Sequence, residues 1–247
     1  MILLNKPKYL TSLQAIERFK ILNPKYLNSK LGYAGTLDPM ATGLLIVLVD
    51  KENLKRDEYI GLNKTYEFEI LLGIETDTYD IFGVISSINK SDIKKLELNN
   101  MLGEYTQKFP AFSAKIINGK RLYKHSLDKT ITENNLPTYK RFIYSLDIID
   151  STIITKKDIL KHVKTATDHI KGDFRFTEIN KSWSDNQDNL EQSYLLTKLR
   201  AEVSSGTYIR RLCVDLATFS NTVGLAYSIN RTKVGNFELT DAIQINN

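Results

Sequence analysis

One carboxylate, Asp38, lies in a glycine-rich segment that is typical of a sharp and rigid loop. Residues 32–43 run GYAGTLDPMATG, and glycines such as Gly35 allow backbone angles that other residues resist. Pro39 disfavours a helical backbone at Asp38 and biases it toward an extended conformation. The apolar run LLIVLV at 44–49 predicts a buried strand directly after the loop. A carboxylate in a stiff turn against a core strand is well placed for catalysis, although Asp-Pro also starts many ordinary turns.

Tyr66 is a second candidate for chemistry. The segment 65–72, TYEFEILL, alternates apolar and polar residues, which predicts a half-buried strand with Tyr66 on its apolar face. A tyrosine in that position usually belongs to the core, with its hydroxyl group hydrogen-bonded. In a nucleic-acid site its ring would instead stack on an unpaired base.

Arg210 stands where a predicted strand at 195–203 gives way, through Ser-Ser-Gly-Thr, to a predicted helix at 208–219. It is next to Ile209 on the apolar face, so we expect partial burial, and a buried guanidinium needs a carboxylate partner. Surface exposure is the alternative, since most arginines are exposed. An acidic turn, GIETDTYD at 73–80, lacks the glycine and the distal glutamate of a calcium loop.

The elements that must position these residues are also predicted by the sequence. A first helix is expected at 12–22, where Thr11 and Gln14 match a capping box. A further strand is expected at 141–149 and a further helix at 92–105. Strands outnumber helices and do not alternate with them regularly. We therefore expect an α+β fold with a mixed, mostly antiparallel central sheet, flanking helices and an active-site cleft across the sheet.

Residues 150–192 differ in character from the rest and are expected to be an insertion within a single catalytic domain that spans 1–247. A short strand is expected at 173–179, followed by the polar run SWSDNQDNLEQ. The insertion also contains a basic, amphipathic helix candidate, whose apolar positions are Ile159, Val163, Ala166 and Ile170.

The composition is that of an ordinary globular protein, with 42% hydrophobic residues, 26% charged residues and a net charge of +5. No apolar run approaches the ~20 residues that span a bilayer, and the N-terminus does not resemble a signal peptide. Cys213 is the only cysteine and the three histidines are scattered, so neither a disulfide nor a metal site is expected. We expect a cytoplasmic protein without a cofactor or a membrane contact.

Basic residues concentrate in three segments, 1–35, 114–141 and 198–236. If these segments converge in space, their charge would attract a polyanion, and nucleic acid is the commonest one. A solvated surface explains each segment singly.

The ordered motifs GYAGTLDPMATG, KTY, GIETDTYDIFG, FPAFSAKIINGKRLY and SSGTYIRRLCVDL make the chain similar to the TruB-type tRNA pseudouridine synthases. The resemblance covers about 1–149 and 195–236. It implies the pseudouridine synthase catalytic fold. It also implies isomerisation of the uridine at position 55 in the T loop of tRNA, by base flipping and an aspartate-dependent mechanism that requires no cofactor.

The same resemblance implies roles for individual residues. Asp38 falls on the catalytic aspartate, Arg210 on the arginine that pairs with it, and Asp80 on a further active-site acid. Whether Asp38 attacks the base or the sugar is left open, because a carboxylate can do either. Contacts with the substrate are expected at Tyr66, Tyr33, Lys64 and Ile229.

Some residues depart from the family pattern. Tyr33 stands where these enzymes commonly carry a histidine that contacts the flipped base, so stacking is possible but the hydrogen bonding must differ. Asn230 replaces the first basic residue of a Leu-Arg-Arg motif, while Arg231 keeps the second. His125 and Ser126 replace a common Ala-Arg pair. No C-terminal PUA domain is expected.

Three classes of function are compatible with these residues. The leading one is a stand-alone enzyme that acts on the tRNA T stem-loop as a monomer, without an obligatory protein partner. The second is a tRNA-binding folding chaperone with weak or lost catalysis, which Tyr33 and Asn230 would suit but intact Asp38 and Arg210 argue against. The third, the catalytic subunit of a guide-RNA particle, is disfavoured because such proteins use additional RNA-contacting domains.

Overall fold

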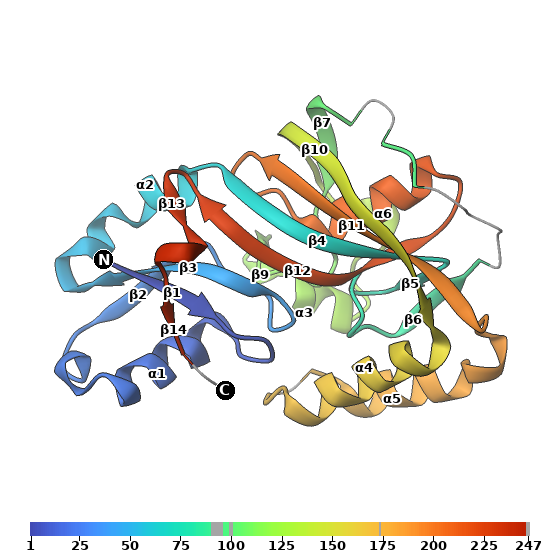
Figure 1. Cartoon of the computed structure of the whole chain (residues 1–247), viewed down its shortest axis with the longest axis horizontal. Helices are drawn as coiled ribbons and strands as arrows, with labels where there is room; N and C mark the ends of the chain where they lie inside the picture. The colour runs from blue at the N-terminus through green and yellow to red at the C-terminus, as the bar shows by residue number, and fades with distance from the viewer. Residues whose placement is uncertain (90–95, 99–100, 173, 246–247) are drawn as a thin grey trace.

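A long, twisted sheet forms the centre of the molecule in a computed structural model, which describes residues 1–89, 96–98, 101–172 and 174–245. In the described chain this sheet has ten strands, eight of them in the order β14-β1-β3-β12-β4-β11-β10-β7, with β2 beside β3 and β13 beside β12. Only the β1–β14 and β3–β12 pairs within it are parallel. Helices lie against the sheet and around its edges (Figure 1). The expected α+β fold with a mixed, mostly antiparallel sheet is confirmed.

The strands have the following bounds. They are β1 (Ile2–Lys6), β2 (Leu31–Ala34), β3 (Thr42–Val49), β4 (Lys64–Leu72), β5 (Ile74–Thr76), β6 (Ile85–Ile88), β7 (Gly103–Lys108), β8 (Ile116–Ile117), β9 (Lys120–Arg121), β10 (Thr138–Thr155), β11 (Ser193–Val203), β12 (Gly224–Val234), β13 (Phe237–Glu238) and β14 (Ile243–Gln244). The helices are α1 (Ser12–Leu22), α2 (Arg56–Gly61), α3 (Leu122–Leu127), α4 (Lys156–His169), α5 (Phe176–Asp185) and α6 (Ile209–Phe219). Short 3-10 helices include η2 (Asp50–Lys55) and η3 (Glu133–Asn135).

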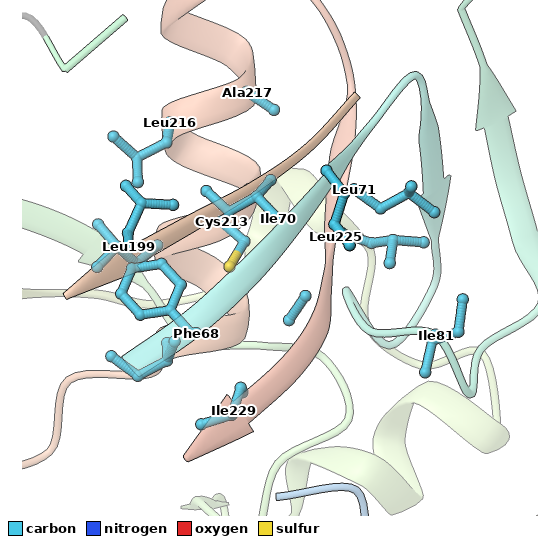
Figure 2. Close-up of a cluster of buried hydrophobic side chains, with 14 of the residues drawn as sticks. Phe68, Ile70, Leu71, Ile81, Leu199, Cys213, Leu216, Ala217, Leu225 and Ile229 are labelled. Atoms are coloured by element: carbon cyan, nitrogen blue, oxygen red, sulfur yellow. The ribbon is translucent and has the colours of Figure 1, made fainter. Parts of the chain in front are cut away.

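The largest core lies between α6 and the centre of the sheet (Figure 2). Cys213 and Leu216 of α6 are fully buried and belong to the same cluster as Phe68 of β4 and Leu225 of β12. Apolar residues that recur at helical spacing form this face of α6, as the sequence predicts. Because α6 is packed firmly on the sheet, the residues of its first turn have fixed positions.

The start of α1 is held by the predicted capping box. Thr11 Oγ1 accepts a hydrogen bond from the Gln14 N–H, and Gln14 Oε1 accepts one from the Thr11 N–H. Ala15 and Phe19 are buried against β1 and β3. The predicted bounds of this helix, 12–22, agree with α1.

Two predicted elements are wrong. The described part of 92–105 contains no helix, and from Gly103 onward it is β7, which pairs with β10. Likewise, the strand expected at 173–179 is not found in the described residues, because α5 begins at Phe176. The alternation in FRFTEI hid a helical pattern in which Ile179 and Trp183 are buried. Residues 90–95, 99–100 and 173 lie outside the described chain.

Helices α4 and α5 connect β10 to β11 and lie within the expected insertion at 150–192. Trp183 is 2% exposed and donates from Nε1 to Gly83 O at 3.1 Å, which fixes α5 beside the β5–β6 hairpin. The apolar positions expected in the amphipathic helix face inward: Ile159, Val163 and Ala166 are buried. None of the described helices has the length and apolar character needed to cross a membrane.

Candidate active site

Asp38 lies on the loop that joins β2 to β3, and hydrogen bonds hold this loop on both sides of it. The Leu37 N–H donates to Ser12 Oγ at 3.0 Å. The Tyr9 N–H donates to Pro39 O at 2.8 Å. Since Ser12 is the first residue of α1, the N-terminus of that helix fixes the loop against the body of the protein. The Asp38 side chain is 38% exposed, so its carboxylate is held and still accessible.

Arg210 lies in the first turn of α6 and points at Asp38. Its side chain is only 5% exposed. Nε donates to Asp38 Oδ2 at 2.8 Å, and Nη2 lies 3.4 Å from Oδ1. The remaining donors reach Thr78 O at 2.6 Å and Phe112 O at 3.2 Å. Burial by itself would lower the pKa of Arg210, but the nearby carboxylates raise it above its usual value, so this residue is a permanent cation.

Asp80 is the second carboxylate at this guanidinium. Its Oδ2 lies 3.7 Å from Arg210 Nε, and its Oδ1 accepts hydrogen bonds from Thr78 Oγ1 at 2.8 Å and the Phe82 N–H at 2.9 Å. Burial raises the pKa of Asp80 to about 6, although Arg210 acts in the opposite direction. The two carboxylates therefore differ: Asp38 reaches solvent, whereas Asp80 is enclosed.

A cavity of about 480 Å³ opens beside Asp38. Tyr66 on β4 and Ile229 on β12 both line it, and they are 8% and 4% exposed. Their strands are neighbours in the sheet, which places the ring and the aliphatic side chain in the same wall. The structure thus brings Asp38, Arg210, Tyr66 and Ile229 to one cavity.

Lys64 also lines this cavity, but its ammonium group is bonded within the protein. It donates to Ile60 O, Leu62 O and Ser205 Oγ, the last at 3.4 Å. Burial, together with the nearby charge of Arg231, lowers the pKa of Lys64 to about 8. Lys64 therefore ties the start of β4 to the loop before α6.

A second cavity of about 670 Å³ lies on the Asp80 side of the ion pair. Asp38, Arg210 and Phe112 line both cavities. The second cavity has several aromatic residues in its lining, Phe82 and Phe176 among them. Because Phe176 comes from α5, the expected insertion contributes to the surroundings of Asp38.

Tyr33 lies on β2 and is not among the residues that line either of these cavities. It packs against the cluster beneath α1, and Arg56 lies over its ring at 5.8 Å. Arg56 Nε also donates to Tyr33 O at 2.9 Å. A contact between Tyr33 and a substrate would have to be made outside the cavity beside Asp38.

Lys6 is a site residue that the sequence argument missed. Its side chain is fully buried, and Nζ donates to Leu10 O at 2.7 Å and Pro39 O at 3.5 Å, directly behind Asp38. Burial lowers the pKa of Lys6 to about 7, although Asp38 acts in the opposite direction. The available signal was the alternation in β1, which puts Lys6 on the same face as the buried Leu4.

Arg231 supports the other end of the loop. It is 1% exposed, and it donates to Leu44 O at 2.7 Å and to Gly35 O at 2.9 Å. Gly43 has a φ of +107°, and a Cβ atom there would stand 2.3 Å from Arg231 O. Any other residue at Gly43 would therefore push β3 away from β12.

Taken together, the site offers an accessible carboxylate with a fixed counter-ion, a pocket with an aromatic wall, and several cations. Arg56, Lys115 and Arg141 line the pocket beside Asp38 in addition to the buried bases. No three His, Cys, Asp or Glu side chains in the described part of the chain gather as a metal site. The arrangement suits nucleophilic or electrostatic catalysis on an anionic substrate with a flat ring.

Comparisons with known proteins identify the family of this chain. A model of the TruB family pseudouridylate synthase N-terminal domain matches residues 20–174. The tRNA pseudouridine synthase B of Aquifex aeolicus is 31% identical over 249 residues, which cover 99% of this chain and 71% of that protein. The enzyme of the same name from Mesoplasma florum is 32% identical over 254 residues, which cover 100% of this chain and 72% of that protein.

A solved structure shares the fold. The chain resembles one in a crystal structure of a Cbf5–Nop10–Gar1 complex, with a TM-score of 0.57 and 21% identity. The match covers 99% of this chain and 51% of that chain, so this chain spans about half of its length. The family model and the curated relatives identify the class of protein as a pseudouridylate synthase. The chain belongs to the TruB family.

Proposed function

We propose that this chain isomerises uridine to pseudouridine in tRNA, and that its target is the uridine at position 55 of the T loop. The observation that carries the proposal is the accessible Asp38 carboxylate, clamped by Arg210 at the edge of a cavity that Tyr66 lines. The relatives named tRNA pseudouridine synthase B support the choice of tRNA.

Asp38 is the catalytic residue in this proposal. The isomerisation breaks the C1′–N1 bond of uridine and forms a C1′–C5 bond, while a proton leaves C5 and N1 takes one up. The carboxylate of Asp38 acts on the separated base and sugar, either as a nucleophile or as a compensating charge. Arg210 orients the carboxylate, because its guanidinium lies 2.8 Å away and is itself bound to two backbone carbonyls.

The target base must leave its stack to reach Asp38. Flipping costs a few kcal/mol, and stacking on an aromatic side chain offsets part of this cost. We assign the stacking to Tyr66 and an apolar contact beside it to Ile229, since both line the cavity with Asp38. Asp80 and Lys64 support the site, and Tyr33 contacts RNA only outside this cavity.

RNA binding is assigned to the basic residues at the cavity. Lys115 and Arg141 come from one basic segment of the sequence, Arg231 comes from another, and Arg56 adds a fourth cation. Cations around a pocket attract phosphates and make the affinity depend on salt. In this proposal residues 1–247 act as one catalytic domain, a monomer that binds the T stem-loop without a protein partner.

The test is to incubate an unmodified tRNA transcript with the purified protein and to map pseudouridine chemically. We expect a single modified site at position 55, and an isolated T stem-loop should also react. A transcript with cytidine at that position is the control. Salt-sensitive binding without product would instead favour a folding chaperone, and a requirement for another protein would favour a guide-RNA particle. Either result would overturn the proposal.

A further inference from the structure

Arg211, which follows Arg210 in α6, belongs to a separate network that runs from the buried Tyr79 to Glu133, whose side chain is 48% exposed. The Arg211 side chain is 14% exposed, and Nε donates to Asp215 Oδ1 at 2.8 Å, one turn further along the helix. Nη1 donates to Glu133 Oε1 at 2.5 Å and lies 3.4 Å from Tyr79 Oη. The proposed mechanism gives this network no role.

Tyr79 occupies the turn that holds Arg210. It stands between Thr78, whose carbonyl accepts from Arg210, and Asp80, whose carboxylate lies beside the same guanidinium. Its φ is +64°, in the left-handed region that an aromatic residue rarely adopts. Tyr79 is 4% exposed, and its hydroxyl donates to the Glu133 carboxylate. The surrounding contacts must therefore hold the turn in this conformation.

Glu133 connects the network to a third part of the site. It begins η3, and it lies in the segment 109–136 that also supplies Phe112 O to Arg210. Arg210 and Arg211 thus hold the same two parts of the chain, the 78–80 turn and the 109–136 segment. Arg210 binds their backbone carbonyls, whereas Arg211 binds their side chains.

We propose that Tyr79 and Glu133, held by Arg211, are positioning residues that set the geometry of the Asp38–Arg210 pair. This inference rests on the proposed function, because its kinetic effect requires Asp38 to be catalytic. Without the Tyr79 hydroxyl contact the turn relaxes toward negative φ, which moves Thr78 O and the Asp80 carboxylate away from Arg210. A displacement of about 1 Å at a catalytic group lowers turnover by up to about 100-fold.

The kinetic test uses two conservative variants, Tyr79→Phe and Glu133→Gln. Each should lower kcat about tenfold while the KM for tRNA stays within about twofold, since neither residue lines the cavity beside Asp38. The double variant should be no slower than the slower single variant, because both changes break one unit. Glu67→Gln is the matched control, since Glu67 also joins two cations, Lys198 and Arg200, but lines neither cavity beside Asp38.

A second measurement does not depend on activity. Hydrogen exchange at the Nε–H of Arg210, assigned by loss of its NMR signal in Arg210→Lys, should be about tenfold faster in Tyr79→Phe than in the wild type. Unchanged exchange together with unchanged kcat would overturn the inference. If the wild type makes no pseudouridine, the proposed function fails, and the exchange rate alone decides whether Tyr79 positions Arg210.

Discussion

At the level of single residues, one guanidinium holds two carboxylates in different environments. Asp38 is 38% exposed and Asp80 is 10% exposed, although both lie within 4 Å of Arg210 Nε. Their exposure differs: the Asp38 carboxylate reaches solvent and can contact a substrate, whereas Asp80 is mostly buried beside Arg210. A buried carboxylate that is ionised at neutral pH carries a desolvation cost, which the protein retains for the sake of the site.

That cost predicts a pH-dependent effect of Asp80→Asn on stability. The pKa of Asp80 is raised from 3.8 to about 6, so between these values the folded state binds a proton that the unfolded state has lost. Stability from this group is therefore present at low pH and is lost as the pH rises to about 6. At pH 8 we therefore expect Asp80→Asn to be more stable than the wild type, with a free energy of unfolding that is larger by about 3 kcal/mol.

Urea denaturation of both proteins between pH 3.5 and pH 8 measures this difference. The gap should close below about pH 4, where both side chains are neutral. A gap that is constant across the whole range would show that burial of the Asp80 charge is not its cause.

At the level of elements, local sequence signals predicted most of the scaffold. The capping box at Thr11 and Gln14 located α1, and the alternation of 65–72 located β4 to within one residue. The apolar spacing in 208–219 located α6 and put Arg210 next to Ile209 on its apolar face, with burial and exposure both left open. Each of these signals depends on neighbours in the sequence, so the sequence alone was sufficient.

Other features depend on partners far away in the chain. The burial of Lys6 and Arg231 requires carbonyl acceptors from the Asp38 loop, Pro39 O and Gly35 O, which only the folded structure supplies. Similarly, the choice between strand and helix at 173–179 is decided by the packing of Trp183 against the β5–β6 hairpin. A substrate contact was predicted for Tyr33 from its position in the motif, but in the structure Tyr33 packs against the cluster beneath α1 and does not line the cavity.

Loss of the α1 cap should destabilise the protein without disabling it. In Thr11→Ala the Gln14 N–H loses its acceptor, which should lower the free energy of unfolding by about 1 kcal/mol. Thermal or urea unfolding measures this change, and Thr11→Ser, which keeps the hydroxyl, is the control. Because Ser12 and its contact with the Asp38 loop remain, kcat should change by less than about twofold. A large fall in kcat at normal stability would contradict this division of roles.

At the level of the whole molecule, basic segments that are distant in the sequence meet at one cavity, as expected for a protein that binds a polyanion. The α4–α5 unit adds further basic residues. Lys157, Lys161 and Lys164 are exposed on α4 at spacings of four and three residues, opposite its buried face. Since α5 contributes to the second cavity beside Asp38, we expect RNA bound at the site to pass close to this unit.

We expect these three lysines to contact RNA phosphates. Replacing all three by glutamine should weaken tRNA binding. It should also lower the slope of log Kd against log salt concentration by about 2–3. The matched control replaces them by arginine, which keeps the charge and should keep the slope. Filter binding or fluorescence anisotropy at several salt concentrations measures both. An unchanged slope in the glutamine variant would show that the face is only solvated.

The most direct test compares wild type and Asp38→Asn in single-turnover conditions, with pseudouridine at position 55 as the readout and tRNA affinity measured in parallel. Asp38→Asn keeps the size of the side chain and one of the two oxygens that accept from Arg210, but removes its charge. We expect pseudouridine formation to slow by at least about a thousandfold while the affinity for tRNA changes by less than about threefold. Equal rates for the two proteins would contradict a catalytic role of this carboxylate.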